Sequence, residues 1–214
     1  MEEKSFNLIL LRHAQSFQNV PDPYPPGFHE DDAPLTPFGL LQAQRLSDRF
    51  EKGDIQHIFA STLIRAAQTV EPTAQKLGLP VILLPDLMEE ETPIAGTELY
   101  HLKELAPSAI PCLEEPSPAG GSLLLGNESV IDLTARGERC IKYFRSVAED
   151  GDTVLAATHA CFFGYILRAA LGISLPESFC WRVNNCAMFR ISYRAGQLPL
   201  LEAANDIYHI ADLI

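Results

Sequence analysis

The sequence predicts an α/β protein with a three-layer αβα arrangement: a mostly parallel central sheet, helices on both faces, and a cap insertion. Short apolar runs alternate along the chain with segments whose apolar residues recur every three or four positions, the helical period. The run Phe6–Leu11 is almost continuously apolar, as expected of a central strand buried on both faces. Alternation of this kind favours βαβ units and therefore parallel pairing of the strands.

Residues that start or stop regular structure mark the elements of the N-terminal half. The stretch 20–37 holds six prolines, which forbid regular structure, so we expect a loop there. Thr36 is a typical helix cap with Pro37 at the first helical position, and Gly53 is expected to end that helix. The next expected elements are a strand over Ile55–Ala60, a helix over Ser61–Leu77 stopped by Gly78, and a strand over Val81–Leu84.

The alternation is interrupted once. Residues 85–127 contain six prolines and the segment Ala119-Gly120-Gly121-Ser122, and we interpret them as a cap insertion over the site, within a single domain of residues 1–214. Beyond the insertion we expect a helix over Ser129–Val147, a strand over Thr153–Ala157, a helix over Cys161–Leu171 closed by Gly172, and two antiparallel strands near Asn185–Tyr193 and Gln197–Ala203.

Composition narrows the class of protein. The longest apolar runs are far shorter than the ~20 residues of a membrane span, and the acidic start Met1-Glu2-Glu3-Lys4 is unlike a secretory signal, so we expect a cytoplasmic protein. The net charge of −12 disfavours nucleic acid and anionic membranes as partners. The five cysteines lack C-x-x-C spacing, which indicates buried free thiols and neither a disulfide framework nor a zinc site.

Three residues lie where a functional site is expected, after the ends of predicted strands. His13 and His159 each follow an expected strand, and Arg65 lies in the first turn of the helix after another strand. In an open α/β sheet, ligands bind at the edge where the strands end. A neutral imidazole is a nucleophile once a carbonyl fixes the N–H of its other nitrogen, and arginines bind phosphate through paired donors. Either histidine alone would more simply be a packed core residue, but the set predicts a phosphate pocket with a nucleophile.

The chain resembles the histidine phosphatase superfamily, in its phosphoglycerate mutase-like branch, through motifs that occur in the family's order. The opening R-H-G-[ED]-[ST]-x-x-N is matched by residues 12–19, P-L-T-x-x-G-x-x-Q-A by 34–43, and S-x-L-x-R-A-x-Q-T by 61–69. Shorter matches are Glu128-Ser129, Thr158-His159-Ala160 and, near the C-terminus, Asn205-Asp206-Ile207-Tyr208-His209-Ile210. Alanine replaces the family glycine at Ala14 and Ala160, which implies a slightly reshaped pocket, and Gln15 replaces an acidic residue, which leaves the site more positive.

The resemblance implies roles for particular residues. His13 becomes phosphorylated while Arg12, Arg65 and His159 hold the phosphoryl group, and Ser16, Asn19 and Ala160 add further phosphate contacts. A glutamate in a leucine-x-glutamate context acts as general acid, which selects Glu89 and leaves Glu91 or another cap residue as the alternative. No metal and no cofactor is implied.

Three functions stay open. The first is a metal-independent phosphomonoesterase that acts on a small phosphorylated substrate through phosphohistidine. The second is a phosphoglycerate mutase, which must retain a bisphosphorylated intermediate and needs basic residues in the cap, yet between Glu89 and Asn127 the only base is Lys103. The third is a non-catalytic protein that binds a phosphorylated ligand, which the intact set of two histidines and two arginines disfavours. The substrate and the oligomeric state are not readable from the sequence.

Overall fold

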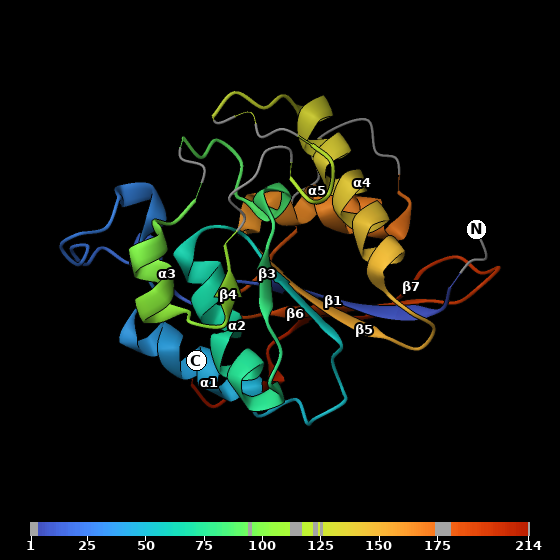
Figure 1. Ribbon diagram of the computed structural model, residues 1–214, viewed down its shortest axis with the longest axis horizontal. Coiled ribbons are helices and arrows are strands. Elements are labelled where there is room, and N and C mark those ends of the chain that lie inside the picture. The colour runs from blue at the N-terminus through green and yellow to red at the C-terminus, as the bar shows by residue number, and fades with distance from the viewer. Residues whose placement is uncertain are drawn as a thin grey trace.

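The computed structural model describes residues 4–93, 96–111, 117–121, 124, 126–173 and 181–213. Its centre is a seven-stranded sheet with the strand order β4-β3-β2-β5-β1-β6-β7 (Figure 1). The pairs β1–β5, β5–β2, β2–β3 and β3–β4 are parallel, and β6 and β7 are antiparallel additions at one side. The strands are β1 (Phe6–Arg12), β2 (His57–Ala60), β3 (Val81–Leu83), β4 (Ala109–Ile110), β5 (Thr153–Thr158), β6 (Met188–Tyr193) and β7 (Leu200–Asp206).

Helices cover both faces of this sheet. In Figure 1, α4 and α5 lie on one side of the sheet and α1 and α2 on the other. The helices are α1 (Pro37–Ser47), α2 (Ile64–Leu77), α3 (Leu99–Leu105), α4 (Val130–Val147) and α5 (Ala160–Leu171). Four 3-10 turns accompany them: η1 (Phe17–Asn19), η2 (Glu30–Asp32), η3 (Pro85–Leu87) and η4 (Tyr208–Ile210). The predicted α/β class with a mostly parallel sheet is confirmed.

Two apolar cores lie on opposite faces of the sheet because successive strand residues point to opposite sides. Leu11 of β1 packs with Leu46 and Val70 in the core beneath α1 and α2. Leu10, its neighbour, packs with Phe144 and Phe163 in the core beneath α4 and α5. Burial on both faces explains why β1 is almost continuously apolar.

Two predicted helices were longer than the helices in the structure. The first helix ends at Ser47, with Asp48 as its C-cap residue, and Gly53 lies further on in a turn at φ +100°. The second helix begins at Ile64, since the backbone N–H of Ser61 still donates to Ala157 in the sheet. Thr36 caps α1 as predicted, with its Oγ1 accepting from the Gly39 N–H at 3.0 Å.

The segment 85–127 contributes to the body of the protein as well as to its periphery. β4 adds to the sheet beside β3, with Val81 opposite Ala109. α3 lies against the proline-rich loop: His101 Nε2 is 2.9 Å from the Gly27 carbonyl oxygen, and the His101 ring stacks on Phe28. These elements are too short for residue periodicity to reveal. The parts of the segment that fall at 94–95, 112–116, 122–123 and 125 lie outside the described residues.

The cysteines divide into two groups. Cys140 and Cys186 are buried thiols, as expected. Cys161 is exposed, which corrects the prediction that the thiols are buried, because it lies in the first turn of α5 at an open edge. Cys112 and Cys180 lie outside the described residues. Across the described residues, no helix is both long and apolar enough to cross a membrane.

Candidate active site

The two strand-end histidines lie side by side. β1 and β5 are parallel neighbours in which Arg12 pairs with Thr158, so His13 and His159 leave the sheet at the same level of the same edge. Their ring centroids are 5.1 Å apart with the planes tilted by 52°. His13 is 4% exposed and His159 is fully buried. The prediction that these residues converge at the carboxyl edge of the sheet is therefore correct.

His13 is held as a neutral imidazole with one free nitrogen. Its Nδ1 lies 2.7 Å from the Ala14 carbonyl oxygen. A carbonyl can only accept, so Nδ1 carries the proton and Nε2 keeps its lone pair. The pKa of His13 lies well below its ordinary value, first because the ring is buried and then because Arg65 and Arg12 are close. The lone pair on Nε2 is thus available at neutral pH, which is what a nucleophile requires.

Arg12 and Arg65 supply positive charge beside this ring. Arg12 Nη1 donates to the Val183 carbonyl oxygen at 2.6 Å, and Arg65 Nη1 donates to the Asp31 carbonyl oxygen at 2.9 Å. Burial lowers the pKa of Arg65 to about 10, which still leaves it charged at neutral pH. The Nε atoms of both arginines are buried and have no hydrogen-bond partner in the structure. Buried guanidinium donors without partners are expected where an anion binds.

The turn η2 fixes the position of Arg65. Asp32 Oδ1 accepts from the backbone N–H of Ile64 at 2.8 Å and so caps the start of α2. The preceding carbonyl, that of Asp31, holds the Arg65 guanidinium. The proline-rich loop that carries η2 therefore places an arginine of another element, which its sequence alone did not indicate.

A cavity of about 420 Å³ opens at this edge of the sheet. Arg12, His13 and Arg65 contribute to its wall, as do residues of the proline-rich loop and of the segment after η3. The full lining is Arg12, His13, Gln18, Asn19, Tyr24, Asp31, Arg65, Glu89, Glu90, Glu91 and Thr92. His159 lies behind His13, and both of its ring nitrogens are buried without a partner. Burial and the neighbouring Arg65 lower the pKa of His159 well below its ordinary value.

Glu89 lines the cavity and caps helix α5. Its Oε1 accepts from the Phe162 N–H at 2.8 Å and its Oε2 from the Cys161 N–H at 3.2 Å. Two N–H groups of the α5 start, those of Cys161 and Phe162, are therefore taken up by Glu89.

The segment that carries Glu89 is held from two sides. Arg136 of α4, 1% exposed, donates from Nη1 to the Met88 carbonyl oxygen at 2.6 Å and from Nη2 to Glu128 at 2.7 Å. The Arg136 guanidinium also lies 3.9 Å from the centre of the Phe162 ring. Thr158 Oγ1 donates to the Leu87 carbonyl oxygen at 2.6 Å. The sequence marked the motif Glu128-Ser129 only as a helix start. In the structure, Glu128 of this motif holds Arg136, which positions the segment that carries Glu89.

The remaining motif residues have different placements. Asn19 lines the cavity, whereas Ser16 is fully buried behind it, with its Oγ 3.3 Å from Asn19 Oδ1. Gln15 is turned towards α1, where its Oε1 accepts from Thr36 Oγ1 at 2.8 Å, and so does not contribute to the cavity wall. Phosphate contacts by Ser16, Asn19 and Ala160 stay predictions.

The two alanines that replace family glycines fit without strain. Ala14 and Ala160 both lie outside the set of described residues with positive φ. Ala14 is fully buried, its N–H donates to Thr69 Oγ1 at 2.9 Å, and Ala160 is the first residue of α5. Neither position needs the conformation that only glycine adopts freely.

Sequence reasoning missed five lining residues: Gln18, Tyr24, Asp31, Glu90 and Thr92. Tyr24 and Asp31 belong to the proline-rich loop, where no periodicity indicates direction, and only the folded chain brings them to the cavity. In the described parts of the chain, no cluster of three His, Cys, Asp or Glu side chains could hold a metal ion.

Comparisons with known proteins agree with this geometry. A family model described as histidine phosphatase superfamily (branch 1) matches residues 8–206. Among curated proteins, a probable phosphoglycerate mutase of Proteus mirabilis is 27% identical over 211 residues, covering 96% of this chain and 95% of that protein.

Solved structures share the fold at low sequence identity. A phosphoserine phosphatase from Entamoeba histolytica superposes with a TM-score of 0.67 at 18% identity, covering 96% of this chain and 99% of that one. A putative alpha-ribazole-5'-P phosphatase from Escherichia coli gives 0.68 at 19% identity, with coverage of 95% and 98%. A match over residues 8–206 includes Arg65 and both strand-end histidines, and this chain therefore belongs to the histidine phosphatase superfamily, in its branch 1.

Proposed function

We propose that this protein is a metal-independent phosphomonoester hydrolase that acts on a small phosphorylated substrate through a phosphohistidine at His13. The observation that carries the proposal is the state of His13, whose Nδ1 is committed to the Ala14 carbonyl while burial and two arginines keep the ring neutral. Arg12 and Arg65 line the cavity beside His13, where they can bind the phosphoryl oxygens. Positioning and charge neutralisation of this kind are the main demands of phosphoryl transfer.

The reaction proceeds in two steps. In the first, His13 Nε2 bonds to phosphorus, the ester P–O bond breaks, and the Glu89 carboxyl group gives its proton to the departing oxygen. In the second, water attacks the phosphohistidine, the Glu89 carboxylate accepts a proton from that water, and inorganic phosphate leaves a free His13. Arg12 and Arg65, which line the cavity, hold the phosphoryl oxygens throughout, and the contact expected of the buried His159 stays a prediction.

Phosphoglycerate mutase activity is the second candidate, because the curated relative from Proteus mirabilis carries that name. A mutase must hold a second phosphate or a carboxylate at the far end of its substrate. Of the residues that line the cavity, the basic ones are Arg12 and Arg65, and both lie beside the nucleophile. Lys103 of α3 is exposed and does not line the cavity. This distribution of charge favours hydrolysis over mutase activity.

One experiment tests the reaction class. Purified protein is assayed for phosphate release from a panel of phosphomonoesters with and without a chelator, and separately for formation of 2-phosphoglycerate from 3-phosphoglycerate in the presence of 2,3-bisphosphoglycerate. We expect phosphate release that the chelator does not reduce. Efficient 2-phosphoglycerate formation without phosphate release would identify a mutase instead.

A second experiment tests the nucleophile. Brief incubation with 32P-labelled substrate is expected to give a phosphoenzyme that is labile to acid and stable to alkali, as phosphohistidine is. His13→Ala should abolish both labelling and turnover while the thermal transition is retained. His57→Ala is the matched control, since His57 lies at the opposite end of the strands and pairs with Asp152 at 3.1 Å. Wild-type turnover by the His13→Ala protein would refute the mechanism.

A further inference from the structure

The cavity wall holds more carboxylates than the proposed reaction requires. Two arginines lie beside the nucleophile, whereas four carboxylates line the same cavity. Glu89 is committed to the α5 start, and an Asp31 carboxylate oxygen lies 3.3 Å from His29 Nδ1, which accepts from the Asp31 backbone N–H. Glu90 and Glu91, which we call the acidic rim, are the two that remain. In the described part of the chain, neither makes an ion pair with a lysine, arginine or histidine.

The acidic rim is costly in the absence of a cation. Glu90 is half-buried, and its pKa is raised first by burial and next by the charge of Glu89. Glu91 holds a left-handed backbone conformation, φ +56°, which is unusual for a residue with a side chain. Like charges held together, and backbone strain, persist at binding sites where the ligand compensates for them.

The proposed function decides which end of the ligand meets the rim. Arg12 and Arg65 line the cavity beside His13, and Arg65 is 3% exposed with its Nε atom unpartnered. In the proposed reaction these donors bind the phosphoryl group next to His13. The acidic rim belongs to another element, the segment after η3, and shares the remaining cavity wall with Gln18, Asn19, Tyr24 and Thr92. An aromatic ring adds to the attraction for a cation.

We propose that the cavity selects phosphomonoesters whose leaving group carries a positive charge, such as the phosphates of small amino alcohols. The inference rests on the proposed phosphohydrolase function and adds its substrate class. The two arginines bind the phosphoryl end, and Glu90 and Glu91 attract the ammonium group at the other end. The same carboxylates repel a leaving group with a carboxylate or a second phosphate, so attraction and repulsion both contribute to selection.

Three phosphates of nearly equal size test the proposal. Phosphoethanolamine, propyl phosphate and phosphoglycolate carry a cationic, a neutral and an anionic group on otherwise similar leaving groups. We expect kcat/KM at low ionic strength to fall in that order, with roughly two- to fivefold between neighbours, the scale of partly exposed charge pairs. Added salt should compress the differences, because it screens exposed charges.

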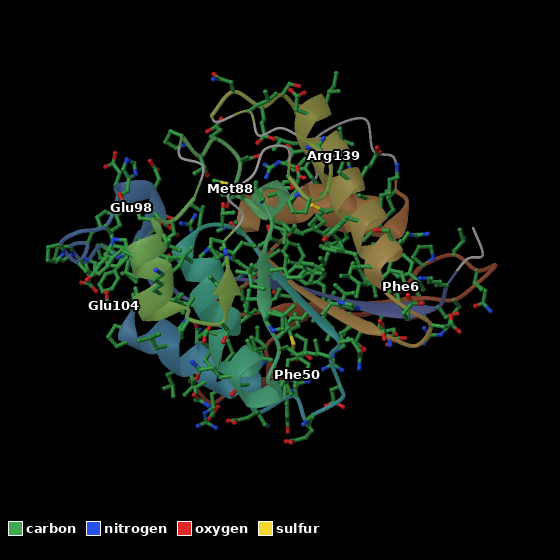
Figure 2. All side chains as sticks on the ribbon, viewed as in Figure 1. Phe6, Phe50, Met88, Glu98, Glu104 and Arg139 are labelled. Carbon is green, nitrogen blue, oxygen red and sulfur yellow. The ribbon has the colours of Figure 1, made fainter. Side chains whose placement is uncertain are left out.

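Substitutions separate the rim from the intrinsic reactivity of each ester. In the Glu90→Gln/Glu91→Gln protein, the ratio of kcat/KM for phosphoethanolamine to that for propyl phosphate should fall roughly two- to fivefold, and the penalty on phosphoglycolate should shrink. The matched control is Glu98→Gln/Glu104→Gln, which removes the same charge from exposed positions on α3 that do not line the cavity (Figure 2). The control should keep the wild-type ratio, since its carboxylates lie away from the substrate.

The outcomes separate the two proposals. If the wild type hydrolyses p-nitrophenyl phosphate through His13 but handles the three esters without preference for the cation, the substrate class is wrong and the phosphatase function stands. The substrate class is equally wrong if the control and the rim variant change the ratio by the same factor, because the effect is then one of net charge. Absence of hydrolysis of every ester overturns the phosphatase proposal and this inference with it.

Discussion

At the scale of single residues, the site depends on what surrounds each functional group more than on the group itself. A histidine with an ordinary pKa near 6.5 would be partly protonated at neutral pH, yet His13 is kept neutral by burial and by the neighbouring Arg65 and Arg12. The bond from Nδ1 to the Ala14 carbonyl then leaves the free lone pair on Nε2. In the proposed mechanism, the nucleophile and the phosphate-binding charge thus depend on one another.

Arg65 is predicted to act on the transition state. Arg65→Ala should lower kcat/KM by roughly three orders of magnitude, because charge on the transferring phosphoryl group is left without its partner. Arg65→Lys should recover little of this, since an ammonium group cannot provide the paired donors of a guanidinium. Steady-state kinetics with thermal melts as a folding control measures both effects, and phosphate and vanadate should inhibit the wild type competitively. Near-normal kcat/KM in Arg65→Lys would exclude the forked contact.

The proposed role of Glu89 as general acid can be tested by varying the leaving group of the substrate. A general acid contributes roughly 10² to 10⁴ in rate, and only when the departing oxygen needs a proton. Glu89→Gln should therefore damage the hydrolysis of propyl phosphate far more than that of p-nitrophenyl phosphate, whose phenolate leaves unaided. Glu98→Gln on α3 is the control. If Glu91→Gln, and not Glu89→Gln, shows the selective loss, the acid is Glu91. Equal losses on both esters would give Glu89 a positioning role.

At the scale of elements, close contacts hold the motif-bearing loops in place. A Cβ at Gly39 would overlap the Gln15 carbonyl oxygen, so α1 approaches the loop after β1 as only a glycine permits. A Cβ at Gly137 would lie 2.9 Å from the Tyr165 carbonyl oxygen, so α4 and α5 are equally close. This second contact brings Arg136 of α4 over Phe162 of α5 and onto the carbonyls before Glu89. Helix packing thus sets the position of Glu89, the proposed general acid.

Arg136 is predicted to position Glu89 without touching substrate. Arg136→Lys keeps a positive charge near Glu128 but loses the fork that holds Met88, so the Glu89 segment should shift and hydrolysis of alkyl phosphates should fall roughly 10- to 100-fold. p-Nitrophenyl phosphate should be affected much less. Arg139→Lys, one turn further on α4 (Figure 2), is the control, since Arg139 contacts the Asp86 carboxylate and is more exposed. Equal losses in both variants would indicate general destabilisation of α4.

At the scale of the whole molecule, buried neutral histidines link stability to pH. Burial lowers the pKa of His209, outside the cavity, to about 4, while the unfolded chain protonates it near 6.5. The unfolded state therefore binds more protons below pH 6.5, and the free energy of unfolding decreases as the pH falls from 6.5 towards 4.

The effect of His209 can be isolated. Between pH 7.5 and 5.5, the wild type should lose about 1 kcal/mol more stability than His209→Asn, because the variant lacks this titrating group. Denaturant unfolding at the two pH values measures the difference. Equal losses in the wild type and His209→Asn would show that His209 is not held neutral.

The amino-acid sequence by itself determined the α/β class, the strand that ends at His13, the strand that ends at His159, and the ordered motifs with Arg65 and Glu89. These are local signals: apolar periodicity, caps and residues next to one another in the chain. The tertiary structure decided that Tyr24 and Asp31 join the cavity, that Glu89 caps α5, and that Arg136 holds the segment before it. These contacts join residues tens of positions apart, and only the packing of helices on the sheet brings such residues together.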